Sequence, residues 1–318
     1  MLGTGPFAVP TFQSLLSSNH EVTCLVTRPD RPVRGRKKLP SNPLRKVAEA
    51  NGLPVFAPES INAAEGLKLL DTQQAELFVV CDYGQILSAE ALGKASRGGI
   101  NLHGSLLPKY RGAAPIQWAL LHGDARAGIT VIHMTTRLDG GPMLTQRAVD
   151  VGRDEDAVQL ERRLAELGVE AVRTSIELLA AWDGSSPIGE VQSPDDVSKA
   201  PRLRKSDGNV DWHRSAEQIF NQVRALKPWP GTFTHLLRDG KSPMRLILER
   251  VNVADTALDL PVGSAKSTDA GTIFVKCGDG VLGIERLQPA GKRSMACAEF
   301  WRGYGAPVMV FGKPQDER

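Results

Sequence analysis

The sequence lacks the features that mark metal centres and membrane segments. Its four cysteines form no CxxC pair, and its six histidines show no HExxH or comparable ligand spacing. Metal catalysis is therefore not expected. No apolar run approaches the roughly 18 residues of a membrane span, and the stretch MLGTGPFAVP has neither the basic nor the apolar region of an export signal. With cysteines that suit reduced, buried thiols, this predicts a cytoplasmic protein.

Nucleotide-binding signatures are also missing or incomplete. No GxxxxGK[ST] phosphate loop occurs in the sequence. The glycine turn Gly3–Ala8 has the spacing of a dinucleotide fingerprint, but Thr27 and Arg28 stand where the acidic ribose-binding residue is expected. A tight strand-to-helix turn is the simpler interpretation of these glycines. An NADP-dependent enzyme stays as one alternative.

The first part of the chain alternates between short apolar runs and segments of helical period. This alternation predicts an α/β domain over 1–185, with a Rossmann-like, mainly parallel sheet covered on both faces. The predicted strands are Glu21–Thr27, Pro54–Ala57, Glu76–Asp82, Gly99–His103 and Ile129–Thr135. The predicted helices are Phe7–Ser18, Pro43–Asn51, Ala63–Gln73, Ala114–His122 and Glu155–Trp182.

The start of this domain is short. Only Met1 and Leu2 precede the glycine turn, whereas a doubly wound sheet normally has its first strand at the centre. We therefore expect a truncated first strand. An inactive RNA-binding relative with a compromised sheet is a second alternative.

The remainder of the chain predicts a linker and a second domain. Residues 186–206 lose periodicity and collect Gly, Ser, Pro and Asp, which indicates a linker. Residues 207–318 hold one predicted helix, Ser215–Leu226, and several short strands, which favour a small β-barrel. Periodicity does not distinguish an oligonucleotide-binding (OB)-like barrel from other small β folds. The predicted strands are Met244–Val253, Gly271–Cys277 and Gly280–Leu287.

Two polar residues follow an apolar run in INLHGSLLPKYRG. Asn101 and His103 fall at the end of a predicted strand, where sites of parallel sheets lie. An amide and an imidazole can donate to a developing oxyanion, and the imidazole can also move a proton. Asp139, in a glycine-rich turn, is a candidate for orienting the imidazole. Ser105 is not in a GxSxG elbow, so direct attack by a substrate amine on an activated carbonyl fits better.

A long basic segment stands apart from the nearly balanced net charge of +3. Between Arg28 and Lys46 the chain carries eight Arg and Lys residues against Asp30 alone, interrupted by prolines and Gly35. Such a loop is either a solvated surface loop or a phosphate-tracking element whose affinity weakens steeply with salt.

The long stretches INLHGSLLPKYRGAAPIQWALLHGD and GITVIHMTTRLDGGPML resemble the signature of the 10-formyltetrahydrofolate-dependent formyltransferases. GTGPFAVPTF, VVCDYGQIL, DGNVDW, ALKPWPGTF and LQPAGKRSM extend the likeness over nearly the whole chain. The resemblance implies a formyl-transfer domain followed by an OB-like, tRNA-binding barrel. It further implies 10-formyltetrahydrofolate as co-substrate and the methionine amino group of initiator methionyl-tRNA as acceptor.

The resemblance also assigns roles to matching positions. Asn101, His103 and Asp139 match the catalytic trio of the family. The folate-contacting positions are Ser105, Leu106, Leu107 and Pro108 in one turn and Tyr83, Gly84, Gln85, Ile86 and Leu87 in another loop. The positions that match contacts to the tRNA acceptor end are Arg34, Arg36, Lys37 and Lys38; whether Arg34 or Arg36 carries the main role stays open. A monomer is expected. A formyltransferase acting on a small amine, either an amino sugar or a glycinamide nucleotide, is the nearest alternative.

Overall fold

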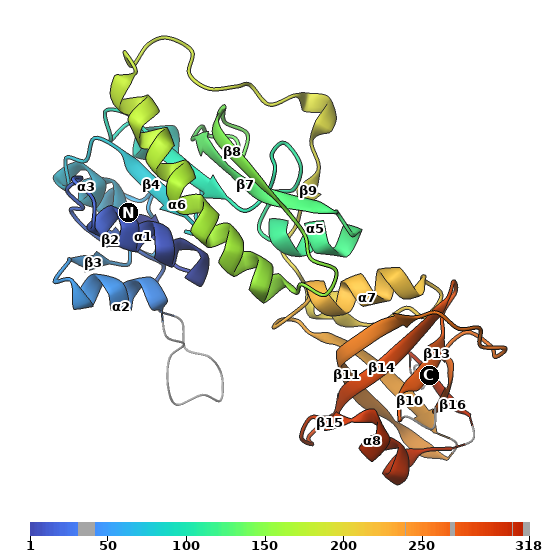
Figure 1. The fold of residues 1–318 in the computed structure, drawn as a ribbon. Helices are drawn as coiled ribbons and strands as arrows, with labels where there is room; N and C mark the ends of the chain where they lie inside the picture. The colour runs from blue at the N-terminus through green and yellow to red at the C-terminus, as the bar shows by residue number, and fades with distance from the viewer. Residues whose placement is uncertain (31–41, 239, 268–270, 307, 314–318) are drawn as a thin grey trace. The chain divides into compact units, whose positions relative to one another are not determined.

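The computed structural model describes residues 1–30, 42–238, 240–267, 271–306 and 308–313 (Figure 1). Two compact units divide the chain. The first comprises Met1–Ile116, Ala125–Val151 and Gln159–Arg202, and the second comprises Gln117–Asp124, Gly152–Val158 and Leu203–Arg318. Among the described residues, every helix is too short or too polar to cross a membrane.

The first unit is built around a seven-stranded sheet in the described residues, with the order β3-β2-β1-β4-β5-β7-β8. β1 to β5 run parallel, and β7 and β8 are antiparallel. The predicted Rossmann-like, mainly parallel sheet is therefore confirmed. The strands are β1 Leu2–Gly3, β2 Leu25–Val26, β3 Val55–Phe56, β4 Phe78–Cys81, β5 Gly99–His103, β7 Arg126–His133 and β8 Met143–Asp150.

β1 comprises Leu2 and Gly3 and lies at the centre of the sheet. Leu2 is buried and pairs with Val26 on one side and Val80 on the other. The amino group of Met1 donates to the carbonyl oxygen of Cys24. Pairing on both edges thus places the glycine turn directly after a central strand.

The helices of this part of the chain follow from capping and apolar spacing. Pro43 begins α2 after Asn42, whose side chain accepts a hydrogen bond from the backbone N–H of Arg45. α6 lies against the sheet (Figure 1), where a Cβ atom on Gly168 would meet the side chain of Leu102 at 2.5 Å. The helices are η1 Pro6–Ala8, α1 Val9–Leu16, α2 Pro43–Ala50, α3 Ala64–Thr72, α4 Ala89–Leu92, α5 Pro115–His122 and α6 Ala157–Ala181.

The second unit contains the predicted small β-barrel, which is antiparallel. It closes through pairing of β11 with β14, and alternate residues of β10 point into the core because strand side chains alternate between faces. Phe300, Phe311 and Trp212 are among the core residues. The elements are η3 Lys205–Gly208, α7 Ala216–Ala225, β10 Thr232–Arg238, β11 Lys241–Ala254, β12 Ser264–Ser267, β13 Ile273–Lys276, β14 Val281–Pro289, β15 Met295–Ala296, α8 Cys297–Tyr304 and β16 Met309–Gly312.

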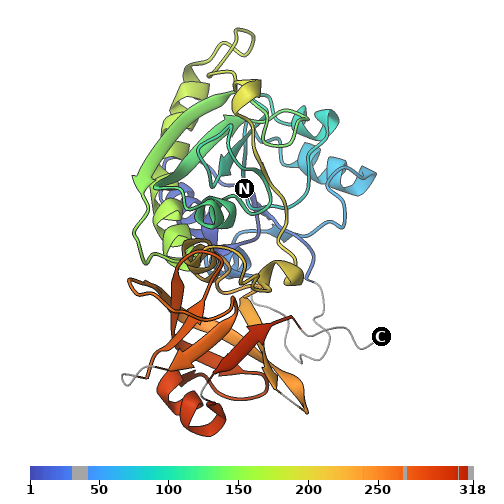
Figure 2. The same cartoon turned by 90° about the vertical axis from the view of Figure 1, so that its right-hand side faces the viewer.

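The segment predicted as a linker has structure of its own. It contains η2 (Pro194–Asp196) and β9 (Lys199–Ala200), and β9 pairs in parallel with β6 (Arg111–Gly112). Up to Arg202 it belongs to the first unit and runs along it as the yellow chain of Figure 2. The domain boundaries 1–185, 186–206 and 207–318 stay a prediction.

Candidate active site

β5 positions the two polar residues singled out in the sequence. Asn101 and His103 are two residues apart, so their side chains project from the same face of the strand. His103 is 6% exposed, and Asn101 is partly buried. The near-continuous apolar run therefore ends with two polar side chains held at the edge of the core.

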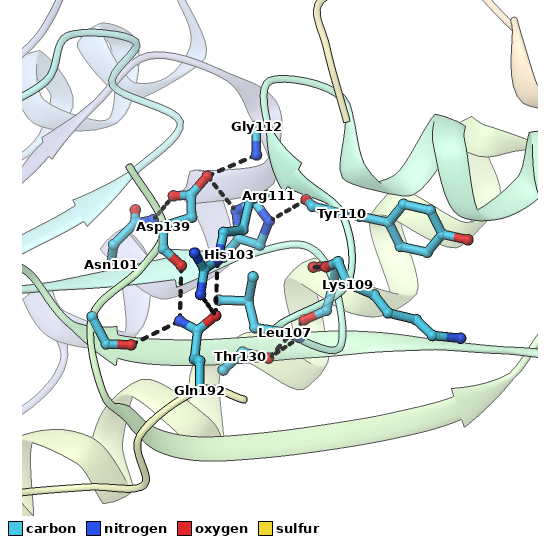
Figure 3. A network of polar contacts seen from close by, with 12 residues as sticks. Asn101, His103, Leu107, Lys109, Tyr110, Arg111, Gly112, Thr130, Asp139 and Gln192 are labelled. Carbon is cyan, nitrogen blue, oxygen red and sulfur yellow. Dashed lines mark hydrogen bonds and ion pairs between the residues drawn. The ribbon is translucent and has the colours of Figure 1, made fainter. Parts of the chain in front are cut away.

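The loop between β7 and β8 brings Asp139 back to β5. Asn101 Nδ2 donates to Asp139 Oδ1 at 3.4 Å, and His103 Nδ1 lies 3.8 Å from Asp139 Oδ2 (Figure 3). The backbone N–H of Gly112 also donates to Oδ2, at 2.8 Å. The structure thus brings the three predicted residues together, while their catalytic roles stay a prediction.

The ring of His103 has one nitrogen committed to the backbone. Nε2 lies 2.9 Å from the carbonyl oxygen of Tyr110, which can only accept a hydrogen bond, so Nε2 carries a proton. Nδ1 is therefore the edge that faces Asp139. Their separation of 3.8 Å is too long for a direct hydrogen bond and corresponds to an ion pair when the ring is protonated.

Asp139 has an unusual backbone conformation. Its φ of 48° lies in the left-handed region, which costs a residue other than glycine about 1–3 kcal/mol and persists only where the surroundings hold it. The backbone N–H of Gly140 closes the turn on the carbonyl oxygen of Arg137, and the carbonyl oxygen of Asp139 accepts from Gln192 Nε2 at 2.8 Å. The carboxylate is 10% exposed. The orientation of the Asp139 carboxylate is consequently fixed both by the hydrogen bonds of its backbone and by the burial of its side chain.

The segment that carries the partners of His103 and Asp139 is held by β9. The backbone N–H of Tyr110 donates to Ser198 Oγ at 2.9 Å, and that of Arg111 donates to the carbonyl oxygen of Ser198 at 2.9 Å. Gly112 has φ 130°, and a Cβ atom there would lie 2.4 Å from the carbonyl oxygen of Ala200. Glycine is needed at this position because any side chain would push β6 and β9 apart.

The turn Ser105–Pro108 is held by hydrogen bonds from side chains of β7 and β8. The buried hydroxyl of Thr130 donates to the carbonyl oxygen of Ser105 at 2.7 Å and accepts from the backbone N–H of Leu107 at 3.0 Å. Gln146 Nε2 adds a bond to the carbonyl oxygen of Leu107. The Ser105 hydroxyl donates to the carbonyl oxygen of Lys109 at 2.6 Å, so it stabilises its own turn and is not aimed at a general base.

Comparisons with known proteins show the family to which this chain belongs. The family model described as "Formyl transferase" matches residues 1–176, and the model "Formyl transferase, C-terminal domain" matches residues 202–305. The chain belongs to the formyl transferase family. The predicted family resemblance is confirmed.

Curated relatives and a solved structure narrow this likeness. Methionyl-tRNA formyltransferase of Rhodopirellula baltica is 46% identical over 313 residues, which cover 96% of this chain and 93% of the relative. Methionyl-tRNA formyltransferase of Geobacter sulfurreducens is 39% identical, and the match covers 95% of this chain and 92% of that relative. The sugar 3N-formyl transferase WlaRD, solved in the presence of dTDP and 5-N-formyl-THF, superposes with TM-score 0.65. It is 18% identical and covers 92% of this chain and 97% of that one, so it supports the fold.

The second predicted folate loop of this formyl transferase combines buried anchors with an exposed apolar side chain. Tyr83 and Leu87 are buried, and Gln85 Oε1 accepts from the backbone N–H of Ile61 at 2.8 Å. Ile86 is 55% exposed. Among the described residues the Tyr83 hydroxyl has no hydrogen-bond partner, and burial raises its pKa to about 12, so it stays a neutral donor.

The glycine turn of this family member is crowded. A Cβ atom on Gly5 would lie 1.7 Å from Oδ2 of Asp82, which follows β4. A carboxyl group against the turn disfavours a dinucleotide phosphate, because phosphate binding there depends on free backbone N–H groups and a positive local potential. The small residues of the turn therefore allow close packing between the first strand and η1.

The basic positions and the remaining candidates complete the comparison with the sequence. Arg34, Arg36, Lys37 and Lys38 lie outside the described residues. The four cysteines are free and buried, as predicted. His133 Nε2 lies 3.0 Å from the carbonyl oxygen of Arg97, and the ring packs edge-on against Trp182, which is a structural role. Within the described ranges no group of three His, Cys, Asp or Glu residues could hold a metal ion.

Sequence reasoning did not single out Gln192, Ser198, Thr130 or Gln146. Gln192 and Ser198 lie in the segment interpreted as a linker, and they contact the site only because β9 pairs with β6. Thr130 was hidden in an apolar strand. A lone hydroxyl side chain within an otherwise apolar strand is the signal that could have identified it.

Proposed function

We propose that this chain transfers the formyl group of 10-formyltetrahydrofolate to the amino group of methionine on initiator methionyl-tRNA, in the cytoplasm and as a monomer. The observation that carries the proposal is the convergence of Asn101, His103 and Asp139 beside the closed Ser105–Pro108 turn. The relatives named methionyl-tRNA formyltransferase, which match nearly the whole chain, support the choice of acceptor.

The folate co-substrate supplies an activated formyl group, so the chain needs no nucleophile of its own. The Asn101 amide has two N–H groups, of which one points to Asp139, and the second donates to the negative charge that develops on the formyl oxygen. Protonated His103 donates from Nδ1–H into the same space, because its Nε2–H is held by the carbonyl oxygen of Tyr110. Donors fixed in this way stabilise developing charge without reorganising during the reaction.

Asp139 removes the proton that the attacking amine must lose. An amine that attacks a carbonyl becomes an ammonium group and must lose a proton. The Asp139 carboxylate, fixed by Gly112, accepts this proton. Protonated His103 gives its Nδ1 proton to the leaving nitrogen as the bond between the formyl carbon and the folate breaks, and Asp139 then returns a proton to Nδ1. The same negative charge stabilises the ring while it carries the proton.

The binding residues follow from exposure and chemistry. The Ser105–Pro108 turn and the Tyr83–Leu87 loop bind the folate, with the exposed Ile86 side chain covering its ring face. The basic positions Arg34, Arg36, Lys37 and Lys38 bind the phosphates of the tRNA acceptor end. The barrel of residues 207–318 adds contacts to the same RNA.

A formylation assay with three acceptors tests this proposal. We expect formylation of charged initiator methionyl-tRNA and a rate at limiting RNA that falls steeply with salt, by about 10³ or more between 50 and 200 mM if six or more phosphates are contacted. Salt-insensitive use of an amino sugar nucleotide or a glycinamide nucleotide alone would refute the choice of acceptor. A folded but inactive protein that still binds RNA would support the inactive relative, and binding of NADP(H) would revive the dinucleotide alternative.

A further inference from the structure

Gln192 occupies a position that links the catalytic loop to the segment preceding the second unit. Its side-chain N–H groups donate to the carbonyl oxygens of Asp139 at 2.8 Å and Gly141 at 2.7 Å. Its Oε1 accepts from Arg111 Nε at 3.0 Å and Nη2 at 2.7 Å (Figure 3). The residue is 6% exposed. Every hydrogen-bonding group of this buried amide is thus used within the protein.

The bonds of Gln192 act on a loop whose backbone is strained at Asp139. Asp139 has a φ of 48°, and its carbonyl oxygen is oriented by the Gln192 amide. Gly141 is packed so closely that a Cβ atom there would lie 1.9 Å from the carbonyl oxygen of His133. Two carbonyl groups of a strained loop therefore depend on a single side-chain NH₂ group.

The other partner of Gln192 belongs to the opposite side of the site. Arg111 lies in β6, between Tyr110, whose carbonyl oxygen faces His103 Nε2, and Gly112, whose N–H donates to Asp139. Gln192 consequently joins the segment that orients His103 to the loop that presents Asp139. A shift of this amide changes the separation of the two side chains even though it touches neither of them.

We infer that Gln192 is a positioning residue for formyl transfer, which sets the alignment of Asp139 with His103 from the segment leading to the second unit. The inference rests on the proposed function and adds to it a residue that acts through Asp139. A displacement of about 1 Å in such an alignment lowers a rate by about 10²-fold.

Two substitutions separate positioning from simple packing. Gln192→Met keeps the length and volume of the side chain but removes all four hydrogen bonds. Gln192→Glu keeps the shape, preserves the acceptor for Arg111 and removes both donors, which leaves a carboxylate against two carbonyl oxygens. Ser175→Ala is the matched control, because Ser175 is a fully buried residue of the same unit whose hydroxyl bonds to Ala171 and Thr145, away from the site.

For Gln192→Met we expect kcat to fall by about 10- to 100-fold, with nearly unchanged KM values for methionyl-tRNA and for the folate. The pH at which kcat reaches half its maximum should shift as well, since Asp139 and His103 no longer face each other at the same distance. Ser175→Ala should keep the kcat, KM and pH profile of the wild type, even if its melting temperature falls as far as that of Gln192→Met.

Gln192→Glu gives an independent readout. Protonation of the new carboxyl restores one donor, so its kcat relative to wild type should recover as the pH is lowered, whereas that of Gln192→Met should not. Unchanged kcat and pH profile in both Gln192 variants would overturn the inference. So would an equal loss in Ser175→Ala. A wild-type protein that fails to formylate methionyl-tRNA would instead overturn the proposed function, before any variant is compared.

Discussion

The Nε2 atom of His103 lies 2.9 Å from the carbonyl oxygen of Tyr110, so the backbone fixes the ring and leaves Nδ1 facing Asp139. The edge of the imidazole that faces Asp139 is thereby defined by a main-chain group seven residues away in the sequence. His103 needs no second carboxylate to hold its orientation.

Replacing His103 by alanine tests the role of that edge. We expect His103→Ala to lower the formylation rate by about 10²- to 10³-fold, the usual cost of losing a preorganised donor, while the fold survives. His20→Ala is the control, because His20 is exposed in the turn that follows α1, where its backbone N–H donates to Ser18 Oγ. Near-wild-type turnover of His103→Ala in a single-turnover assay would remove this residue from the mechanism.

Thr130 should matter for both stability and folate affinity. Thr130→Val keeps the shape of a fully buried side chain but leaves the carbonyl oxygen of Ser105 and the N–H of Leu107 without their partner. We expect a loss of about 1–3 kcal/mol in the free energy of unfolding and a raised KM for the folate.

The chain offers a matched control for Thr130. Thr11 is 1% exposed, and its hydroxyl has no hydrogen-bond partner among the described residues. Thr11→Val is therefore expected to be neutral or stabilising in denaturant unfolding, because it removes a buried unsatisfied group. Equal losses for Thr11→Val and Thr130→Val would show that the hydrogen bonds of Thr130 are not the cause.

Gly112→Ala should separate β6 from β9. The added Cβ atom meets the carbonyl oxygen of Ala200 at 2.4 Å, so the strands must move apart and the bond from Gly112 to Asp139 is lost. We expect a destabilisation of about 1–3 kcal/mol and a clear loss of activity. Gly52→Ala also replaces a glycine with positive φ but meets no atom within 4 Å, and activity should survive there. Equal activity in the two variants would contradict the close-approach argument.

Glu161 makes the stability of the first unit depend on pH. Burial, and then the charge of Asp82, raise the pKa of Glu161 above its ordinary value of 4.5. The folded state therefore binds this proton more tightly than the unfolded state, so the free energy of unfolding falls as the pH rises from about 4.5 through the raised pKa. Glu161→Gln should be more stable than wild type at neutral pH, and the difference should shrink in acid.

The matched control for this prediction lies on the same helix. Glu166 is exposed, and Glu166→Gln removes the same charge without relieving a buried carboxylate, so it should bring no gain in stability at neutral pH. Denaturant titrations at several pH values between about 4 and 8 measure both variants. A Glu161→Gln curve parallel to that of the wild type would show that Glu161 is not the titrating group.

The parts of the fold that the sequence predicted are those where burial is continuous. β4 and β5 read as apolar runs because both faces of the sheet are covered, and the polar residues at the end of β5 then stand out. β8 was missed because it lies at the edge of the sheet, where only Thr145 of its eight residues is buried and no apolar run marks the strand. The strand predicted over Glu21–Thr27 shrinks to Leu25–Val26, since the ladder on both sides pairs only these residues.

The candidate site likewise has residues that the sequence indicates and residues that it does not. Asn101 and His103 could be found because they are neighbours on one strand, and Asp139 because a glycine-rich turn follows a strand. Gln192 is 53 residues beyond Asp139 in a stretch with no periodicity, so nothing local in the sequence indicates their contact. Long-range pairing of β6 with β9 creates that part of the site, and pairing of two-residue strands leaves no readable pattern.

The position of β9 has a consequence for the order in which the protein is made. A nascent chain that has completed α6 at Ala181 already contains Asn101, His103 and Asp139, but neither Gln192 nor the strand that pairs with β6. Because synthesis proceeds from the amino terminus, the Asp139 loop gains its last hydrogen bonds only when residues up to 200 have left the ribosome. The hydrogen bonds that fix the Asp139 loop are therefore completed by residues that follow α6, and not by α6 itself.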